Sequence, residues 1–506
     1  MKIQRKTFWR CAYILIILLS LVSCDNENGE LEDATQLESV ETNIADQEID
    51  ALEDHNEDSD VADKIDEIVD KVHFQDEEFE KQVLINLGID KENLSYSVLE
   101  AQEELRFENC EINSFEDLKM FPNLRILSFH GGVKLNCRLS ELTKHETIEE
   151  LYFIGETGKI LHIEDDLSFI SELPKLRVLY IDHAEIDGTV EDIVGASNLR
   201  KLVLHCNGIS GELSELSNLR NLEHLRITAT SIKGSTNNFN DFERLNYLSL
   251  SYCEPTVNLS DLSNLNDLQY LYLKQIQLNG SVADLSKLHH LKELSILDLY
   301  DISSFSEIQM EMLTQFKEIE IINFGGASRV VGNIESLQEL DTLRKIEIYS
   351  NSLVGDIATF SEMYNLEEIS LRFAEVHGNI SDFNQLSDLK ILDLTGTEVS
   401  GDVNDLKPLI NLESIYLSLT SVSGDINFVE SMFKLENIDV SDTIITGELK
   451  VFSEFEHIKR IYIGSTKIIG DLSWLNNLSS LEYIGIKETE LTGKLTPSDG
   501  RKVTVE

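Results

Sequence analysis

Residues 389–412 read LKILDLTGTEVSGDVNDLKPLINL, and this stretch decides how the rest of the chain is interpreted. Leu392 and Leu394 alternate with polar residues, which is the pattern of a strand that buries one face. Thr397 and Gly401 follow, and leucines then recur at every third position. The same pattern returns 23 residues earlier and later, so we expect a stack of copies of one short unit.

The apolar residue at the centre of each strand, here called the anchor, keeps this spacing in two long runs. The first run is Leu179, Leu202, Leu225, Leu248, Leu271 and Leu294. The second run is Ile346, Ile369, Leu392, Ile415, Ile438, Ile461 and Ile484. Irregular units are anchored at Leu105, Leu127, Leu151 and Ile322, which gives about 17 units in all. Longer spacings predict insertions near 154–168 and 297–316.

Three further positions recur within the unit. Five residues after the anchor stands a small or polar residue, which we expect to turn inward and bond backbone groups of the next coil. These residues include Asn207, Thr230, Cys253, Asn351, Thr397, Thr420, Thr443, Thr466 and Thr489. Nine residues after the anchor stands glycine, as in Gly378 and Gly401, where a Cβ would be forbidden. The aspartates that follow, such as Asp356, Asp402, Asp425 and Asp471, are interpreted as solvated edge charges, with calcium binding as the alternative.

Over about residues 105–495 this pattern resembles that of leucine-rich repeat proteins. The resemblance implies an α/β leucine-rich repeat solenoid, with a curved parallel sheet on its concave side. Short helical or 3₁₀ turns are expected on the convex side, since such a short coil leaves little room for a full α-helix. Residues 73–104, with helical spacing over 76–87 and Gly88 after it, resemble the small N-terminal cap of internalin-like bacterial proteins. Residues 496–506 are expected to be a C-terminal tail.

The N-terminus reads MKIQRKTFWRCAYILIILLSLVSC over residues 1–24. A basic start followed by a short apolar run is typical of a signal peptide. The apolar run is too short to span a bilayer as a helix. The end of the run, Leu21-Val22-Ser23-Cys24, resembles the lipobox of bacterial lipoproteins. This resemblance implies a signal peptide over 1–23, a lipid on Cys24, and an extracytoplasmic protein attached to the bacterial cell membrane. An ordinary signal peptide or membrane anchor is the alternative.

Strong acidity shapes the next segment and excludes one class of partner. Residues 25–72 contain 19 acidic residues and two lysines. We therefore expect residues 24–72 to comprise the lipidated cysteine and an acidic, disordered tether that follows it. The whole chain carries a formal charge of −50. A nucleic-acid-binding protein needs a basic surface, so this excess of acidic residues excludes nucleic acid as a partner.

Tyrosines occur at positions expected to face outward on the concave side. Aromatic side chains provide large contact areas at low entropic cost, so these positions are candidates for ligand binding. The alternative is that strands simply favour aromatic residues. The candidate residues are Tyr180, Tyr247, Tyr252, Tyr270, Tyr272, Tyr349, Arg372, Tyr416 and Tyr462.

The sequence shows no motif for catalysis, phosphate binding or metal binding, so we expect no enzyme activity, no cofactor and no metal site. The cysteines after Cys24 are expected to be free and mostly buried, with a Cys110–Cys137 bridge as the alternative.

The leading functional hypothesis is a lipid-anchored surface protein that binds a protein or peptide ligand through its concave face, in adhesion or host contact. The alternative is a structural envelope spacer without a specific ligand. Self-association at the C-terminal sheet edge would favour that alternative, since an uncovered edge invites pairing.

Overall fold

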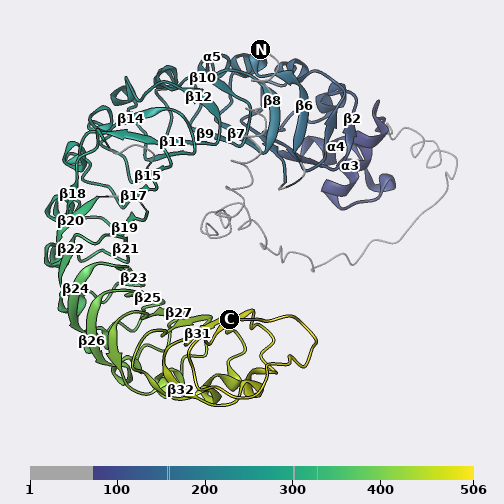
Figure 1. Ribbon diagram of the computed structural model, residues 1–506. Helices are drawn as coiled ribbons and strands as arrows, with labels where there is room; N and C mark the ends of the chain where they lie inside the picture. The colour runs from purple at the N-terminus through teal and green to yellow at the C-terminus, as the bar shows by residue number, and fades with distance from the viewer. Residues whose placement is uncertain (1–71, 157, 159, 300–302, 327–328) are drawn as a thin grey trace, which may run out of the picture. The chain divides into compact units, whose positions relative to one another are not determined.

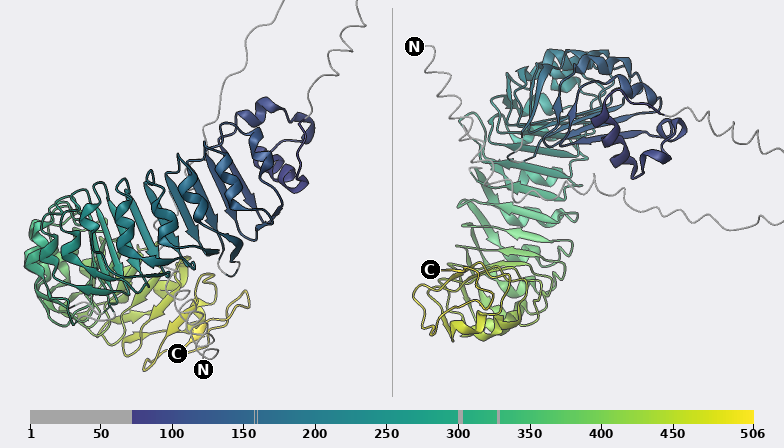
Figure 2. Two further views of the ribbon diagram at one scale, coloured as in Figure 1. Left: turned by 90° about the horizontal axis from the view of Figure 1, so that it is seen from above. Right: turned by 90° about the vertical axis from the view of Figure 1, so that its right-hand side faces the viewer.

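The computed structural model describes residues 72–506 except 157, 159, 300–302 and 327–328. The signal peptide, Cys24 and the tether up to residue 71 lie outside the described residues. The described coils belong to one compact unit, Asp70–Glu506. Its coils stack side by side, as both views of Figure 2 show.

The unit begins with two short α-helices, α3 (Glu77–Leu87) and α4 (Tyr96–Glu100). The helix predicted over 76–87 is α3, with Asp76 accepting hydrogen bonds at its start and Gly88 at its end in the left-handed conformation (φ 62°). Phe79 of α3 is fully buried and its ring centre lies 4.9 Å from that of Phe107 in the first strand. The helix therefore covers the apolar end of the first coil.

One strand from each coil joins a parallel sheet of 18 strands, which lines the inner side of the stack in Figure 1. The anchors pair directly with one another, as Leu225 does with Leu248 and Leu392 with Ile415. The predicted fold class is thereby confirmed. Across the sheet the strands are β1 (Glu104–Glu108), β3 (Ile126–His130), β5 (Glu150–Ile154), β7 (Val178–Asp182), β9 (Lys201–His205), β11 (His224–Thr228), β13 (Tyr247–Ser251), β15 (Tyr270–Lys274), β17 (Glu293–Leu297), β19 (Ile321–Phe324), β21 (Lys345–Ile348), β23 (Glu368–Ser370), β25 (Ile391–Asp393), β27 (Ser414–Tyr416), β29 (Asn437–Asp439), β31 (Arg460–Tyr462), β33 (Tyr483–Gly485) and β34 (Thr504–Val505).

A second, interrupted row of strands follows the bend of each coil. It comprises β2 (Glu111–Ile112), β4 (Lys134–Leu135), β6 (Leu161–Asp166), β8 (Ala184–Asp187), β10 (Ser210–Glu212), β12 (Ser231–Lys233), β14 (Thr256–Asn258), β16 (Gln277–Asn279), β18 (Ile308–Gln309), β20 (Val330–Asn333), β22 (Leu353–Asp356), β24 (Glu375–Asn379), β26 (Glu398–Asp402), β28 (Ser421–Ser423), β30 (Thr446–Glu448) and β32 (Lys467–Ile469). This row was not part of the prediction.

The return path of each coil is a short turn of helix, as predicted. Apart from α5 (Val190–Val194), these turns are 3₁₀ helices. They are η4 (Glu116–Met120), η5 (Leu139–Lys144), η6 (Ser168–Glu172), η7 (Leu213–Asn218), η8 (Phe239–Asp241), η9 (Leu259–Leu262), η10 (Val282–Leu285), η11 (Met310–Gln315), η12 (Ile334–Glu339), η13 (Ile357–Phe360), η14 (Ile380–Phe383), η15 (Val403–Leu406), η16 (Ile426–Val429), η17 (Leu449–Glu454) and η18 (Leu472–Leu475). A further 3₁₀ helix, η3 (Lys91–Asn93), lies between α3 and α4.

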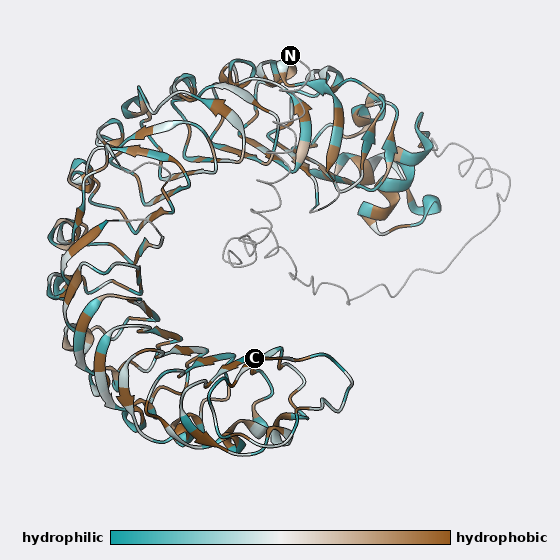
Figure 3. Ribbon diagram, viewed as in Figure 1, coloured by the Kyte–Doolittle hydropathy of each residue, from teal (hydrophilic) through white to brown (hydrophobic). Residues whose placement is uncertain are grey.

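Alternating polar and apolar residues keep each coil amphipathic, as the colouring of Figure 3 shows along the ribbon. The anchors are completely buried, and so are the apolar residues two positions after most of them, such as Leu394 after Leu392. Because each coil buries this surface only against its neighbours, the stack acts as one hydrophobic core.

The threonines at the inward-turning position behave differently from the prediction, whereas Nδ2 of Asn207 donates a 3.4 Å hydrogen bond to the carbonyl of Ile181 in the preceding coil. Thr397, Thr420 and most of the equivalent threonines are buried, but they do not bond the next coil. Thr397 donates a 2.7 Å hydrogen bond to the carbonyl of Leu394 in its own coil, and Thr420 bonds Leu417 in the same way. The carbonyl three residues back lies within reach of a threonine at a bend, so the bond closes locally. Asn351 does not turn inward at all and is exposed.

The aspartates after the glycines cap the 3₁₀ turns. Asp402 accepts a 2.9 Å hydrogen bond from the backbone N–H of Asn404, and Asp356, Asp425 and Asp471 do the same in their coils. None of these four aspartates is buried, so they lie at the edge as predicted, and capping is a structural role that the prediction did not include.

The prediction that only glycine fits nine residues after the anchor is confirmed at Gly401. Gly401 has φ +123°, and a Cβ there would lie 2.4 Å from Oδ1 of Asn379 in the preceding coil.

The first predicted insertion contains β6, whose pairing with β8 shifts register between His162 and Asp166. Residues 300–302 of the second insertion lie outside the described residues. Among the described residues, Cys110, Cys137, Cys206 and Cys253 are all free, so the Cys110–Cys137 bridge is absent there. The tail expected over 496–506 contains β34, which pairs with β33 and extends the sheet.

Candidate ligand-binding face

All nine candidate residues are partly exposed, and each lies in a strand of the 18-stranded sheet or within two residues after one. Tyr180, Tyr247, Tyr270, Tyr272, Tyr416 and Tyr462 lie in the strands β7, β13, β15, β15, β27 and β31. Tyr252, Tyr349 and Arg372 follow β13, β21 and β23. The structure therefore places them along one sheet.

The densest group, here called the tyrosine cluster, consists of Tyr247, Tyr252, Tyr270 and Tyr272 on β13 and β15 and at the end of β13. Tyr247 pairs in register with Tyr270, and their ring centres lie 6.0 Å apart. Lys274 extends over the ring of Tyr252, with Nζ 5.4 Å from the ring centre. These contacts fix the rings side by side, which lowers the entropic cost of presenting them to a ligand.

On the other side of Tyr247 lies His224, the first residue of β11. The two rings are stacked, with their centres 4.0 Å apart and an angle of 7° between the planes. Burial, together with the nearby charges of Lys201 and Arg226, lowers the pKa of His224 to about 3. The imidazole is therefore neutral at physiological pH and continues the aromatic surface.

A second group surrounds Arg372. Its guanidinium carbon lies 5.5 Å from the ring centre of Tyr349 and 5.9 Å from that of Phe373, so it contacts both rings. Nε of Arg372 also lies 3.4 Å from a carboxylate oxygen of Asp393. Tyr349, Arg372 and Phe373 line a hollow of about 520 Å³ at the carboxyl ends of β21 and β23. The hollow combines a cation with apolar rings, a combination suited to binding a carboxylate or an aromatic side chain.

The remaining candidates are further along the sheet in both directions. The ring centre of Tyr180 lies 5.8 Å from that of Tyr152 on β5. The ring centre of Tyr462 lies 4.8 Å from that of Tyr483 on β33. Burial raises the pKa of Tyr416, so its hydroxyl stays protonated and able to donate.

Two exposed apolar residues at this face were missed by the sequence analysis. Phe373 and Leu419 expose 53% and 55% of their surfaces, and each stands four residues after its anchor. That position was already assigned to the concave side, so a search for every large apolar residue there, instead of tyrosine alone, would have found them. His224, directly before its anchor, was missed for the same reason.

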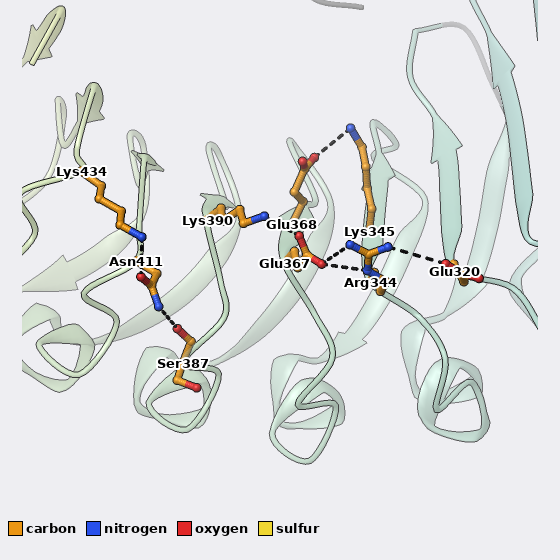
Figure 4. Close-up of polar contacts among 9 residues, drawn as sticks. All are labelled: Glu320, Arg344, Lys345, Glu367, Glu368, Ser387, Lys390, Asn411 and Lys434. Atoms are coloured by element: carbon orange, nitrogen blue, oxygen red, sulfur yellow. Dashed lines mark hydrogen bonds and ion pairs between the residues drawn. The ribbon is translucent and has the colours of Figure 1, made fainter. Parts of the chain in front are cut away.

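Charged side chains form a ladder at the amino-terminal ends of the strands, two residues before most anchors. Asn246 and Gln269 interrupt it. Glu367 bonds both Arg344 in the preceding coil and Lys390 in the following one, as Figure 4 shows. Hydrogen bonds from Lys390, together with Arg344, lower the pKa of Glu367. Arg344 continues to Glu320, whose carboxylate lies 3.7 Å away. This ladder leaves little unbalanced charge here and makes a structural role the simplest explanation.

The geometry of stacked parallel coils agrees with a comparison of the sequence with protein families. Residues 160–399 match the model of the leucine-rich repeat region. The described part of the chain has the fold of a leucine-rich repeat solenoid. A comparison with curated protein sequences finds no match.

Solved structures support the same fold for the solenoid. A Leptospira interrogans leucine-rich repeat protein matches 74% of this chain and 92% of its own, with a TM-score of 0.54 and 19% identity. The ectodomain of the Arabidopsis thaliana receptor kinase GASSHO1/SCHENGEN3 matches 81% of this chain with a TM-score of 0.56 and 18% identity. This chain spans only 50% of that ectodomain. The structure of the Arabidopsis receptor kinase HAESA has a TM-score of 0.55 and 16% identity. The match covers 80% of this chain and 78% of the HAESA chain. At these identities the likeness is one of fold.

Proposed function

We propose that this solenoid binds a protein or peptide ligand through its concave sheet. The observation that carries the proposal is the series of partly exposed aromatic side chains held at fixed spacing by adjacent strands, most densely in the tyrosine cluster. Rigid aromatic groups on a preformed surface are the usual anchors of protein interfaces. The mostly acidic chain also favours a ligand with basic groups.

Two of the structural neighbours support a ligand of this class. The GASSHO1/SCHENGEN3 ectodomain was solved in complex with CASPARIAN STRIP INTEGRITY FACTOR 2. HAESA was solved with the peptide hormone IDA and the co-receptor SERK1. Those ligands belong to those proteins, and they support here only the use of such a solenoid for polypeptide recognition.

We further propose that Cys24 attaches the chain by lipid to the outer side of a bacterial cell membrane, where the solenoid would serve adhesion or host contact. In the described part of the chain, none of the helices has the length and apolarity needed to cross a bilayer. In cells, Cys24→Ala should leave the signal peptide uncleaved or release the protein into the medium. A processed Cys24→Ala chain that stays with the membrane fraction would contradict the lipid anchor.

Site-specific crosslinking in cells tests the binding proposal. A photoreactive phenylalanine analogue replaces Tyr272 on the concave sheet in one variant and Tyr364 in the other. Tyr364 is an exposed tyrosine outside the sheet, at 58% of its surface, and serves as the matched control. We expect a discrete crosslinked product from position 272 and none from 364. Equal products from both positions, or none from either, would contradict binding at the concave face.

The alternative function, a structural spacer that associates with itself, depends on the C-terminal edge of the sheet. There β34 forms the last strand of the sheet, and it is only two residues long. Such a short strand offers few free backbone groups for pairing, which weakens this alternative. Sedimentation of the purified chain at rising concentration distinguishes the two, because a spacer of this kind would form larger species.

A further inference from the structure

Four polar side chains gather at the carboxyl ends of β7 and β9, apart from the tyrosine cluster. Asp182 and His205 are the last residues of these strands and pair in register. His183 and Cys206 follow them at equivalent positions of adjacent coils, both in the left-handed conformation with φ 46° and 47°. One nitrogen of each imidazole and Sγ of Cys206 lie within 4.8 Å of one another.

The carboxylate of Asp182 orients both rings. Its Oδ1 lies 2.6 Å from Nδ1 of His183 and 2.9 Å from Nδ1 of His205. The ring centres are 4.9 Å apart with an angle of 76° between the planes. The three side chains expose only 19%, 23% and 14% of their surfaces, so this arrangement is shielded from water. A carboxylate that fixes the imidazole of a ligand is a common feature of zinc sites.

The backbone around the cluster is closely packed. The N–H of Gly155 in the preceding coil donates a 2.7 Å hydrogen bond to the carbonyl of Asp182. A Cβ at Gly155 would lie 2.1 Å from the carbonyl oxygen of His183, so only glycine fits there. The backbone N–H of His183 in turn donates to the carbonyl of His205. The positions of the side chains are thus fixed by three neighbouring coils.

Cys206 differs from the other described cysteines. Burial alone would raise the pKa of its thiol, but hydrogen bonds with His183 and His205 outweigh burial and lower the pKa to about 7. Burial raises the pKa of Cys110 to about 11 and those of Cys137 and Cys253 to about 12. The observation that points to a metal is the geometry, since Cys206 Sγ and one nitrogen of each of the two imidazoles lie within 4.8 Å of one another.

We propose that His183, His205 and Cys206 bind a Zn²⁺ ion, with Asp182 orienting both imidazoles. Two imidazoles and a thiolate form a ligand set preferred by zinc over calcium or magnesium, which take oxygen ligands. Zn–N and Zn–S bonds of about 2.0–2.3 Å require ligand atoms about 3.3–3.6 Å apart, so the three atoms would move together only slightly. A water molecule would complete the tetrahedral site, whose protein ligands join two adjacent coils.

Metal analysis of the full-length chain tests the site. The purified protein is stripped with a chelator, dialysed against zinc chloride and then passed over a desalting column. We expect about one zinc ion per chain to be retained by the wild type and lost in Cys206→Ser and His205→Gln. Asp182→Asn should weaken zinc binding about 10–100-fold, because it removes the group that orients the ligands. Cys253→Ser and His290→Gln serve as matched controls, since both residues lie outside the cluster, and they should retain zinc.

Cobalt substitution identifies the sulfur ligand directly. The Co²⁺ form of the wild type should show sulfur-to-metal charge-transfer absorption, and the Cys206→Ser form should lack it. Equal zinc retention by the wild type and both cluster variants, or the absence of any retained zinc, would overturn the proposal. Neither result bears on ligand binding at the tyrosine cluster, so the two proposals fail independently.

Discussion

At the scale of single residues, the bends that contain Thr397 and Thr420 are closed by bonds within their own coils. Thr397 bonds a carbonyl three residues back, and Asp402 caps the turn that follows. Contact between coils at the bend occurs instead at the glycine, where Gly401 lies against Asn379. The glycine is therefore the residue at the bend whose replacement should disturb the stacking most.

Gly401→Ala should lower the free energy of unfolding by about 1–3 kcal/mol, because alanine would be strained at φ +123° and its Cβ would meet Asn379. The control is Gly208→Ala, since a Cβ at Gly208 approaches nothing closer than 3.9 Å. Chemical denaturation followed by circular dichroism measures both. Equal stability of Gly401→Ala and the wild type would show that the close approach is unimportant.

A second residue-scale prediction concerns pH. His224 is neutral when folded, with its pKa lowered to about 3 by burial and by Lys201 and Arg226, but takes up a proton near pH 6.5 when unfolded. Its stabilising contribution is therefore present above about pH 6.5 and is lost as the pH falls, by up to about 1.4 kcal/mol per pH unit. His224→Gln should lose less stability than the wild type between about pH 7 and pH 4 in thermal melts. Parallel losses in both proteins would contradict this assignment.

Sequence periodicity predicts some residue positions better than others. The anchors follow from their spacing because a buried apolar residue in every coil must face the same way. The bond of Thr397 does not follow, because a hydroxyl at a bend can reach either its own coil or the next one. The candidate zinc ligands could have been found from spacing, since His183 and Cys206 stand four residues after consecutive anchors and stacking must place them side by side.

At the scale of elements, the strands of the concave sheet are joined at one edge by ion pairs. Glu367 links Arg344 and Lys390, so one carboxylate connects three coils. Partly exposed pairs contribute little individually, and their value here lies in the network they form along the sheet. This ladder could have been predicted from spacing, because Arg344, Glu367 and Lys390 stand two residues before consecutive anchors.

Glu367→Gln should lower the free energy of unfolding by no more than about 1 kcal/mol, and the difference from the wild type should shrink in high salt. Glu362→Gln is a suitable control, as no ion pair is found for Glu362 in the described part of the chain. Denaturant titrations at low and high salt measure both variants. A difference that persists unchanged at high salt would contradict an electrostatic origin.

At the scale of the whole unit, every inner coil buries its apolar surface against a neighbour on both sides. The first and last coils have a neighbouring coil on one side only. The first coil is covered by α3, through Phe79 and Phe107. The last is extended only by the two residues of β34. The helical cover was predictable from its amphipathic spacing, but β34 was not, because two residues provide no periodic pattern.

Hydrogen–deuterium exchange should reflect this difference. We expect the slowest amide exchange in the central strands, such as β15 and β25, and the fastest in β33 and β34, with β1 protected by α3. Mass spectrometry of peptic fragments resolves these regions. Faster exchange in β1 than in β33 would show that α3 does not protect its end of the solenoid.

The central claim is that the aromatic side chains of the concave sheet bind the ligand. The most direct measurement is the dissociation constant of the crosslinked partner for three proteins: the wild type, the double variant Tyr270→Ala, Tyr272→Ala, and Tyr364→Ala. We predict that the double variant binds about tenfold more weakly or worse, with an unchanged circular dichroism spectrum, while Tyr364→Ala binds like the wild type. Unchanged affinity in a correctly folded double variant would contradict the claim.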